Sequence, residues 1–419
     1  MILLLHLFSM VSCMKYWMSC LMLALPFLSE GGGFQINTQS QKATSMGGSV
    51  TGNALDASVV FYNPGGMSML DSNTFNLGLS ALMPGTAFLG LTGGQEDMKS
   101  KVYLPAYFYG LYFLDEKSSI GLSVNSPFGL GTEWEDQWSG RYISTKAKLT
   151  TLFIQPSLGY KISDRISIGV GPVFVLGNAD LNKALPVTGA DGVEATAELK
   201  GNGNGFGVNG GVMMAFGKTS VGLNYRSSVK IKLEDGEADF NNVPSSLISN
   251  GTFVNSASFN SEITLPAVAS IGIGYKVNEE LLVNLDLNYT FWSVYDSLNF
   301  LFPDHSSLDS RNARAYENSL AVRLGAQYNY SERLKIRGGL AFDQSPVQDG
   351  YVSPELPDAD RLIVSAGFTL KMKKGWSVEG TLLFEDVRER KEENNVQNNF
   401  NGTYKSYLYG AGVGVQYAF

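Results

Sequence analysis

The side chains that could do acid–base or nucleophilic chemistry are scarce in this sequence. It has two histidines, His6 and His305, and two cysteines, Cys13 and Cys20. Three of these four fall in an N-terminal segment that we expect to be removed, which leaves His305 between an aspartate and a serine. A serine–histidine–aspartate triad is defined by geometry and not by adjacency in sequence. The sequence therefore predicts no enzyme, no cofactor and no metal site.

Cationic side chains are better candidates for function, because a carboxylate is held most strongly by a cation and above all by a bidentate arginine. In the alternating segments described below, four cations fall on the polar face: Arg226, Lys230, Arg323 and Arg337. We take them as candidates for binding a ligand carboxylate inside the protein. The alternative is a structural role, since polar interiors pair such cations with acids such as Asp286, Glu379 or Glu385.

Residues 1–30 are expected to form a secretory signal peptide. Lys15 follows Met14, and if Met14 is the true start, a positive region precedes an apolar one. Cleavage between Ser29 and Gly33 would send the chain out of the cytoplasm and leave a mature protein without cysteine. A retained membrane anchor is the alternative.

From residue 73 onward the hydrophobic pattern repeats every two residues, as it does in β-strands whose two faces differ. At residues 221–233 the apolar side chains occupy odd positions and polar ones lie between them. Many such segments exceed ten residues, whereas strands of soluble proteins average about 5–6 and membrane-spanning strands need about 9–11. We count about fourteen segments, at 74–84, 101–114, 118–126, 142–161, 165–178, 194–217, 219–233, 258–277, 281–300, 317–330, 333–345, 360–373, 376–389 and 404–419. The predicted fold class is all-β, a transmembrane antiparallel β-barrel over residues 73–419.

The connections between these segments fall into two alternating classes. Short polar turns are predicted at 115–118, 163–164, 217–218, 278–280, 331–332 and 373–375. Longer polar loops are predicted near 85–100, 127–141, 179–193, 234–257, 301–316, 346–359 and 390–403. Short turns at one end and long loops at the other are typical of outer-membrane barrels with both termini in the periplasm. The last strand ends on the aromatic Phe419, which we expect the barrel assembly machinery to recognise.

Residues 31–72 break the alternation and carry the most specific motif. The run from Gly33 to Asn37, followed by the run from Asp56 to Met67, closely resembles the FadL family of outer-membrane transporters. The run from Ser126 to Leu130, followed by two tryptophans and Gly-Arg-Tyr at 140–142, is also similar to that family.

The resemblance implies a fourteen-stranded barrel whose N-terminal segment, here residues 31–72, folds inward as a hatch. It implies transport of long-chain fatty acids or similar hydrophobic compounds by extracellular capture, internal binding, hatch movement and lateral release through the wall. The family's Asn-Pro-Ala hatch motif matches Asn63, Pro64 and Gly65, and glycine in the third place is expected to loosen the turn.

Two further sites follow from the resemblance and from residue types. The family's third strand bends inward and opens the wall, and the matching residues are Ser126, Pro127, Phe128 and Gly129. Proline supports a break in the ladder because it lacks an N–H donor; an ordinary strand end is the alternative. An extracellular groove is expected at Trp134, Trp138, Leu181 and Leu185, with loop packing as the alternative.

The expected partners are a hydrophobic ligand such as a long-chain fatty acid, outer-membrane lipid and lipopolysaccharide, and the family resemblance suggests a monomer. The net charge of −8 includes no basic patch that would indicate nucleic acid. A general diffusion porin would explain the barrel but not the segment before it, and a transporter of another hydrophobic small molecule would use similar pockets. A structural or adhesive barrel would have no continuous internal path.

Overall fold

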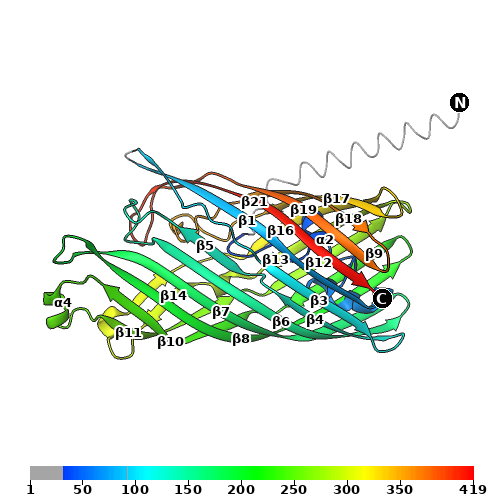
Figure 1. The fold of residues 1–419 in the computed structure, drawn as a ribbon, viewed down its shortest axis with the longest axis horizontal. Coiled ribbons are helices and arrows are strands. Elements are labelled where there is room, and N and C mark those ends of the chain that lie inside the picture. The colour runs from blue at the N-terminus through cyan, green and yellow to red at the C-terminus, as the bar shows by residue number, and fades with distance from the viewer. Residues whose placement is uncertain (1–31, 92) are drawn as a thin grey trace.

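The computed structural model describes residues 32–91 and 93–419, and these form one antiparallel sheet closed into a barrel (Figure 1). The sheet closes because β1 (Thr74–Gly90) pairs with β21 (Gly402–Ala418) along the whole length of both strands. The predicted signal peptide lies outside the described residues. None of the helices in the described part of the chain is long and apolar enough to cross a membrane.

Within the described residues, fourteen strand positions make up the wall, and five of them consist of two consecutive segments. The continuous ones are β1, β3 (Ala106–Phe113), β6 (Lys146–Ser163), β7 (Ile166–Thr188), β8 (Glu194–Phe216), β17 (Leu334–Asp343), β18 (Arg361–Lys371), β19 (Trp376–Val387) and β21. The divided ones are β4 (Ser118–Asn125) with β5 (Gly129–Glu133), β9 (Thr219–Arg226) with β10 (Val229–Asn241), β11 (Ser256–Leu265) with β12 (Val268–Lys276), β13 (Leu281–Thr290) with β14 (Ser297–Leu301), and β15 (Ser310–Ala313) with β16 (Ser319–Asn329). The prediction of an antiparallel fourteen-stranded barrel is confirmed.

Short turns join the strands at one end of the barrel and longer loops at the other. The loops carry two small strands, β2 (Gln95–Asp97) and β20 (Arg390–Glu392), and the short helix α4 (Ser245–Ser249). The loop predicted at 179–193 is mostly strand, because the ladder of β7 and β8 continues through Ala184 opposite Thr196. Leu181 and Leu185 therefore project from a strand and not from a loop.

The side chains of the seventh strand position change faces between β9 and β10. Leu223 and Tyr225 point outward and are exposed, whereas Ile231 and Leu233 are fully buried inside the barrel. Arg226 lies opposite Asn209, but Lys232 lies opposite Asn204, so the strand takes up one extra residue at Ser227–Ser228. A shift of one residue moves every later side chain to the other face. The prediction of a single apolar face through 219–233 is therefore wrong.

This change marks the boundary between two interiors. At the loop end, the inside of the barrel holds one large apolar cluster that includes Phe128, Trp292 and Phe259. At the turn end, the inner wall carries mainly Ser, Thr, Asn and Gln together with glycine, and the N-terminal segment fills it.

Candidate functional site

Residues 34–72, which lie within the segment 31–72 predicted as the hatch, pack against the inner wall, and we call these residues the hatch. It contains two short α-helices, α2 (Gln41–Ser45) and α3 (Val59–Tyr62), and the 3₁₀ helix η2 (Pro64–Met69). Wall side chains donate hydrogen bonds to hatch carbonyls: Gln155 to Val60 (2.7 Å), Asn209 to Phe61 (2.9 Å), Asn284 to Ser49 (2.8 Å) and Thr381 to Gln41 (2.9 Å). Polar groups thus satisfy a backbone that has little regular secondary structure of its own.

Asn63 ties the predicted hatch motif to the wall. Its side chain is fully buried and donates to the carbonyls of Thr51 (2.9 Å) and Val212 (3.1 Å), while its Oδ1 accepts from the N–H of Gly65 (3.1 Å). It therefore caps η2, holds the preceding hatch turn and binds β8 at the same time.

Glycine at position 65 lets the hatch approach the wall closely. This close approach, and not the looser turn expected from the sequence, accounts for the glycine. A Cβ atom on Gly65 would lie 2.6 Å from the backbone of Gly211, and a Cβ on Gly211 would lie 2.0 Å from Asn63 Oδ1. Neither position has room for a methyl group, because Gly65 lies against the backbone of β8 and Gly211 lies against the Asn63 side chain.

A buried ionic group fastens α2 to the strands on the other side. The ammonium of Lys42 lies 3.1 Å from Glu379 on β19 and 3.5 Å from Asp56 in the hatch, and all three side chains are almost wholly buried. Nearby, burial raises the pKa of the hatch phenol Tyr62 above its ordinary value, so Tyr62 stays neutral. The hatch is thus seated by charge and hydrogen bonding.

The third strand position is interrupted at the residues predicted to form the kink. β4 ends at Asn125, and Ser126–Phe128 turn inward before β5 begins at Gly129. The interrupted backbone pairs with the hatch: Ile36 N donates to Pro127 O (2.8 Å) and Gly129 N to Phe34 O (3.0 Å). The neighbouring strand β3 follows β4 no further than Phe108 opposite Val124. β5 therefore has a ladder partner on its β6 side and none on its β3 side.

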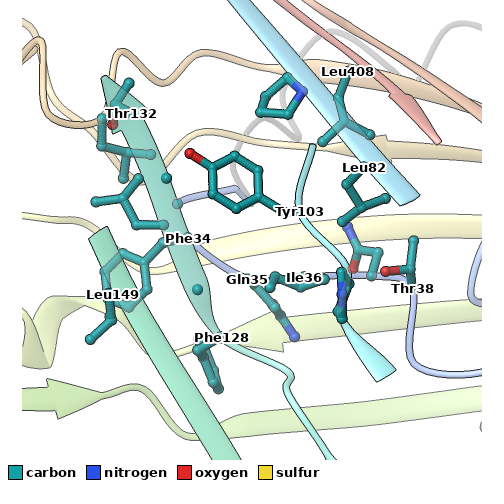
Figure 2. A pocket seen from close by; sticks show the side chains of 18 of the residues that line it. Phe34, Gln35, Ile36, Thr38, Leu82, Tyr103, Phe128, Thr132, Leu149 and Leu408 are labelled. Atoms are coloured by element: carbon teal, nitrogen blue, oxygen red, sulfur yellow. The ribbon is translucent and has the colours of Figure 1, made fainter. Parts of the chain in front are cut away.

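A cavity of about 490 Å³ occupies this break in the wall (Figure 2). The hatch lines one side with Phe34 and Ile36, and exposed Leu104 from the outer surface lines another. Figure 2 shows the Tyr103 ring projecting between β5, which carries Thr132, and the side formed by Leu82 and Leu408. The break in the ladder therefore coincides with a cavity whose lining runs from the hatch to the exposed Leu104.

Two more cavities adjoin this one on the side of the loop end. The outermost, of about 420 Å³, is lined by Leu181, Leu185 and several phenylalanines. A small cavity of about 50 Å³ shares Leu181 and Arg314 with it, and shares Phe34, Leu149 and Leu356 with the wall cavity. Arg314 is 8 % exposed and forms an ion pair with Glu355 where the outer two cavities meet.

The strand is interrupted at the predicted kink residues, and the two leucines predicted for an extracellular groove line the outermost cavity, but Trp134 and Trp138 do not form a groove surface. Both tryptophans are buried and stack on each other at 4.2 Å between ring centroids. The Trp134 indole donates to Pro354 O (3.1 Å) and Trp138 to Ser144 O (2.8 Å). They pack the loops together, which was the alternative interpretation.

The four predicted carboxylate-binding cations lie away from the three cavities. Lys230 does not face the lumen, because the face change after Arg226 turns it outward to pair with Glu262 (2.7 Å). Arg226 lies over the Phe61 ring at 3.8 Å, and Arg323 pairs with Asp343 (2.8 Å). Arg337 donates to Gln327 (2.8 Å) and Thr369 (2.8 Å).

Sequence reasoning missed several other residues that line the cavities. Arg314 falls in the loop predicted at 301–316, and the aromatic Phe34 stood in the recognised motif without a predicted role. Arg361 was also missed, although it lines the wall cavity, pairs with Asp358 and donates to Gly33 O (3.2 Å). Among the described residues, no group of three or more His, Cys, Asp or Glu side chains is placed to hold a metal ion.

Residues 24–419 match the protein family described as outer membrane protein transport protein (OMPP1/FadL/TodX). A long-chain fatty acid transport protein of Escherichia coli O6:H1 is 27 % identical, over 96 % of this chain and 98 % of the relative. The crystal structure of a Pseudomonas aeruginosa FadL homologue superposes with a TM-score of 0.83 at 18 % identity, covering 93 % of this chain and 100 % of the other. That of the P. putida toluene transporter TodX gives 0.69 at 16 % identity, covering 93 % and 99 %. The chain belongs to the OMPP1/FadL/TodX family and is an outer-membrane β-barrel transporter of hydrophobic compounds.

Proposed function

We propose that this protein imports long-chain fatty acids, or hydrophobic compounds of similar shape, and releases them sideways into the outer membrane through the opening beside Ser126–Gly129. The observation that carries the proposal is the series of three adjoining cavities that runs from the loop end to that opening. The fatty acid transport protein among the relatives supports this choice of cargo.

Capture would begin in the outermost cavity. Phe240, Phe253, Phe300 and Phe302 line it together with Leu181 and Leu185, and a hydrocarbon tail gains free energy by leaving water for such a surface. Arg314 supplies a cation at its inner end, where a carboxylate headgroup could replace Glu355 as the partner. An amphipathic acid thus finds both of its parts accommodated.

Phe34 would control passage between the small cavity and the wall cavity. It lines both and is 5 % exposed, with its ring centroid 4.8 Å from Trp292 and 5.4 Å from Tyr295. Because Phe34 belongs to the hatch segment that pairs with the kink, a ligand that displaces this ring would also loosen the pairing. The two states would then differ in ligand affinity, as a gated carrier requires.

Lateral release follows from the polarity of the barrel. An apolar chain moving straight down would have to replace the hydrogen-bonded polar groups between hatch and wall, and each group left without a partner costs about 1–3 kcal/mol. The wall cavity instead leads past Tyr103 to the exposed Leu104 on the lipid-facing side. The sideways route is therefore the less costly one.

A disulfide across the hatch–kink pair tests the mechanism. Gln35 and Phe128 face each other in an antiparallel bridge whose flanking hydrogen bonds leave them a non-hydrogen-bonded pair. Such pairs have Cα atoms about 4.5 Å apart, which suits a disulfide. In the double variant Gln35→Cys/Phe128→Cys, we expect oleate uptake by cells lacking their own transporter to be low after oxidation and restored by reductant.

The two single-cysteine variants are the controls and should show no redox dependence. Unchanged uptake in the oxidised double variant, with the disulfide verified by mass spectrometry, would exclude hatch movement at this pair. If reduced protein carried toluene but no oleate, the cargo would be a small aromatic hydrocarbon. Uptake of small sugars at the same rate would favour a general diffusion porin.

A further inference from the structure

A group of buried charges beside the wall cavity contains one carboxylate more than it has cations. Arg361 on β18 pairs with Asp358 and lies 3.5 Å from Glu385 on β19, and all three side chains are largely buried. Asp343 on β17 lies opposite Arg361 in the ladder and pairs with Arg323 at 2.8 Å. Within the described residues, two guanidiniums thus serve three carboxylates. An uncompensated buried charge is costly, so we expect a further cation at this group.

The residues that precede the hatch lie against this group. Asp358 Oδ2 accepts a hydrogen bond from Gly33 N–H at 2.8 Å. A Cβ atom on the buried Gly32 would lie 2.8 Å from Asp358 Oδ2 and 3.0 Å from Gln344 O, which are both acceptors, and 3.2 Å from the Arg361 guanidinium. Since the backbone nitrogen and the Cβ of one residue are about 2.5 Å apart, the nitrogen of Gly32 lies within roughly 5 Å of the Asp358 carboxylate.

The sequence around Gly32 fits a cleavage site for signal peptidase. Such sites carry small residues at the first and third positions before the cleaved bond. In the range where cleavage is expected, only the bond between Gly31 and Gly32 meets this condition, with Ser29 in the third position. Cleavage one residue earlier or later would place Glu30 in one of the two positions. Hydrolysis of the bond adds water and leaves a carboxylate on Gly31 and an amine on Gly32.

We infer that the mature chain begins at Gly32 and that its α-ammonium is the missing cation of the buried group, paired with Asp358. An α-amine carries a positive charge at neutral pH, so three cations then balance three carboxylates. In the precursor the same nitrogen belongs to a neutral peptide bond. Removal of the signal peptide therefore completes the ionic group and fastens Gly33, the residue before Phe34. The inference does not depend on which cargo the transporter carries.

Burial alone and ion pairing change the titration of an amine in opposite directions. A buried amine without a partner loses its proton at lower pH than a free one, whereas an amine beside a carboxylate keeps its proton to higher pH. Only an unprotonated amine reacts with formaldehyde in reductive methylation. Gly33 lines the wall cavity, which gives this small reagent access to the site. The pH at which methylation of the α-amine is half-maximal therefore distinguishes pairing from burial.

Reductive methylation of the full-length protein, expressed with its signal peptide and purified in mild detergent, tests the inference by mass spectrometry of the N-terminal peptide. We expect this peptide to begin at Gly32. Its α-amine should reach half-maximal methylation about one pH unit or more above the same amine in protein unfolded in urea, where α-amines titrate near about 8. In Asp358→Asn the difference should disappear, so that methylation at pH 7 is about tenfold faster than in wild type.

The matched control is Asp386→Asn, which removes the neighbouring carboxylate of β19. Asp386 is exposed and pairs with Lys405, so this variant should methylate like wild type. If Asp358→Asn fails to fold, Glu385→Gln removes a carboxylate of the same group, leaves Asp358 in place and should lower the half-maximal pH.

A mature chain that begins at any other residue would overturn the inference. So would a wild-type α-amine that titrates at or below the pH found in urea, because that is the result of burial without a partner. Equal half-maximal pH in Asp358→Asn and wild type would also contradict the pairing with Asp358.

Discussion

The two ends of this barrel are built on opposite patterns. Within the membrane band the outside is apolar and the inside is polar, glycine-rich and filled by the hatch. At the loop end the outside carries charged pairs such as Lys230–Glu262, and the inside holds the large apolar cluster around Phe128 and Trp292. The extra residue at Ser227–Ser228 is where the seventh strand passes from one pattern to the other.

The difference shows that each surface is matched to its neighbour. In the half at the turn end (the lower half), the outer side chains face lipid and are apolar, and the inner side chains are polar. In the half at the loop end (the upper half), the outer side chains face water and are polar, and the inner side chains are apolar. The apolar upper interior suits a hydrophobic cargo, and the polar lower interior suits a hatch fixed by hydrogen bonds. The break in the wall lies where the two interiors meet, so the proposed exit would release a cargo where the apolar interior ends.

Deleting Ser228 should have the largest effect, because it should abolish the difference between the two ends of the barrel on this strand. Without the extra residue, Val229, Ile231 and Leu233 would turn outward and the two lysines inward, against an apolar core. We expect the folded, heat-modifiable form to be lost from outer-membrane fractions on gel electrophoresis. Ser228→Ala keeps the chain length and should assemble normally. A folded deletion variant with wild-type oleate uptake would contradict the role given to this residue.

Lys42→Met should weaken the lower half selectively. It leaves the carboxylates of Glu379 and Asp56 buried without their cation, and losing one partner of a buried pair costs about 3–5 kcal/mol. At 1.4 kcal/mol per tenfold, hatch amides should exchange hydrogen at least about 100-fold faster, measured by mass spectrometry. Lys230→Met removes the exposed pair of the upper half, where about 0–1 kcal/mol is at stake. Similar increases in hatch hydrogen exchange in Lys42→Met and Lys230→Met would contradict the difference between the buried and the exposed ion pair.

Gly211→Ala should have the smallest effect, confined to the seat of the hatch motif. The added methyl group would lie 2.0 Å from Asn63 Oδ1, so the motif must shift while the barrel stays intact. We expect a several-fold rise in sensitivity to a small polar antibiotic that outer membranes normally exclude. Gly338→Ala, whose nearest neighbouring atom is 4.0 Å away, is the control. An unchanged sensitivity would mean that the motif does not seal the lumen.

The sequence predicted the barrel well because alternation is a local signal that repeats in every strand. Alternation fixes the period but not which face looks inward, and nothing in Ser227–Ser228 reveals that the faces exchange there. That is why Lys230 was wrongly placed in the lumen. Trp134 and Trp138 were misjudged for a related reason, since residue type alone does not tell a packed loop from an exposed groove.

The path residues were hardest to predict because they meet only in three dimensions. Arg314 and Glu355 pair across 41 positions of sequence, and Phe34 packs against Trp292, which lies 258 positions further along the chain. The kink was predicted because Pro127 and the family resemblance both indicated it. The hatch residues around Ile36 that pair with the kink could be predicted from neither.

The seam between β1 and β21 has a consequence for the order of assembly. The hatch ends at residue 72 and β1 begins at Thr74, so the hatch is tethered at the short-turn end of one of the two strands whose pairing closes the barrel. It need not be threaded through a finished ring. It can settle on the glycine-lined surface of a still open sheet, and the closing of the seam then locks it in place.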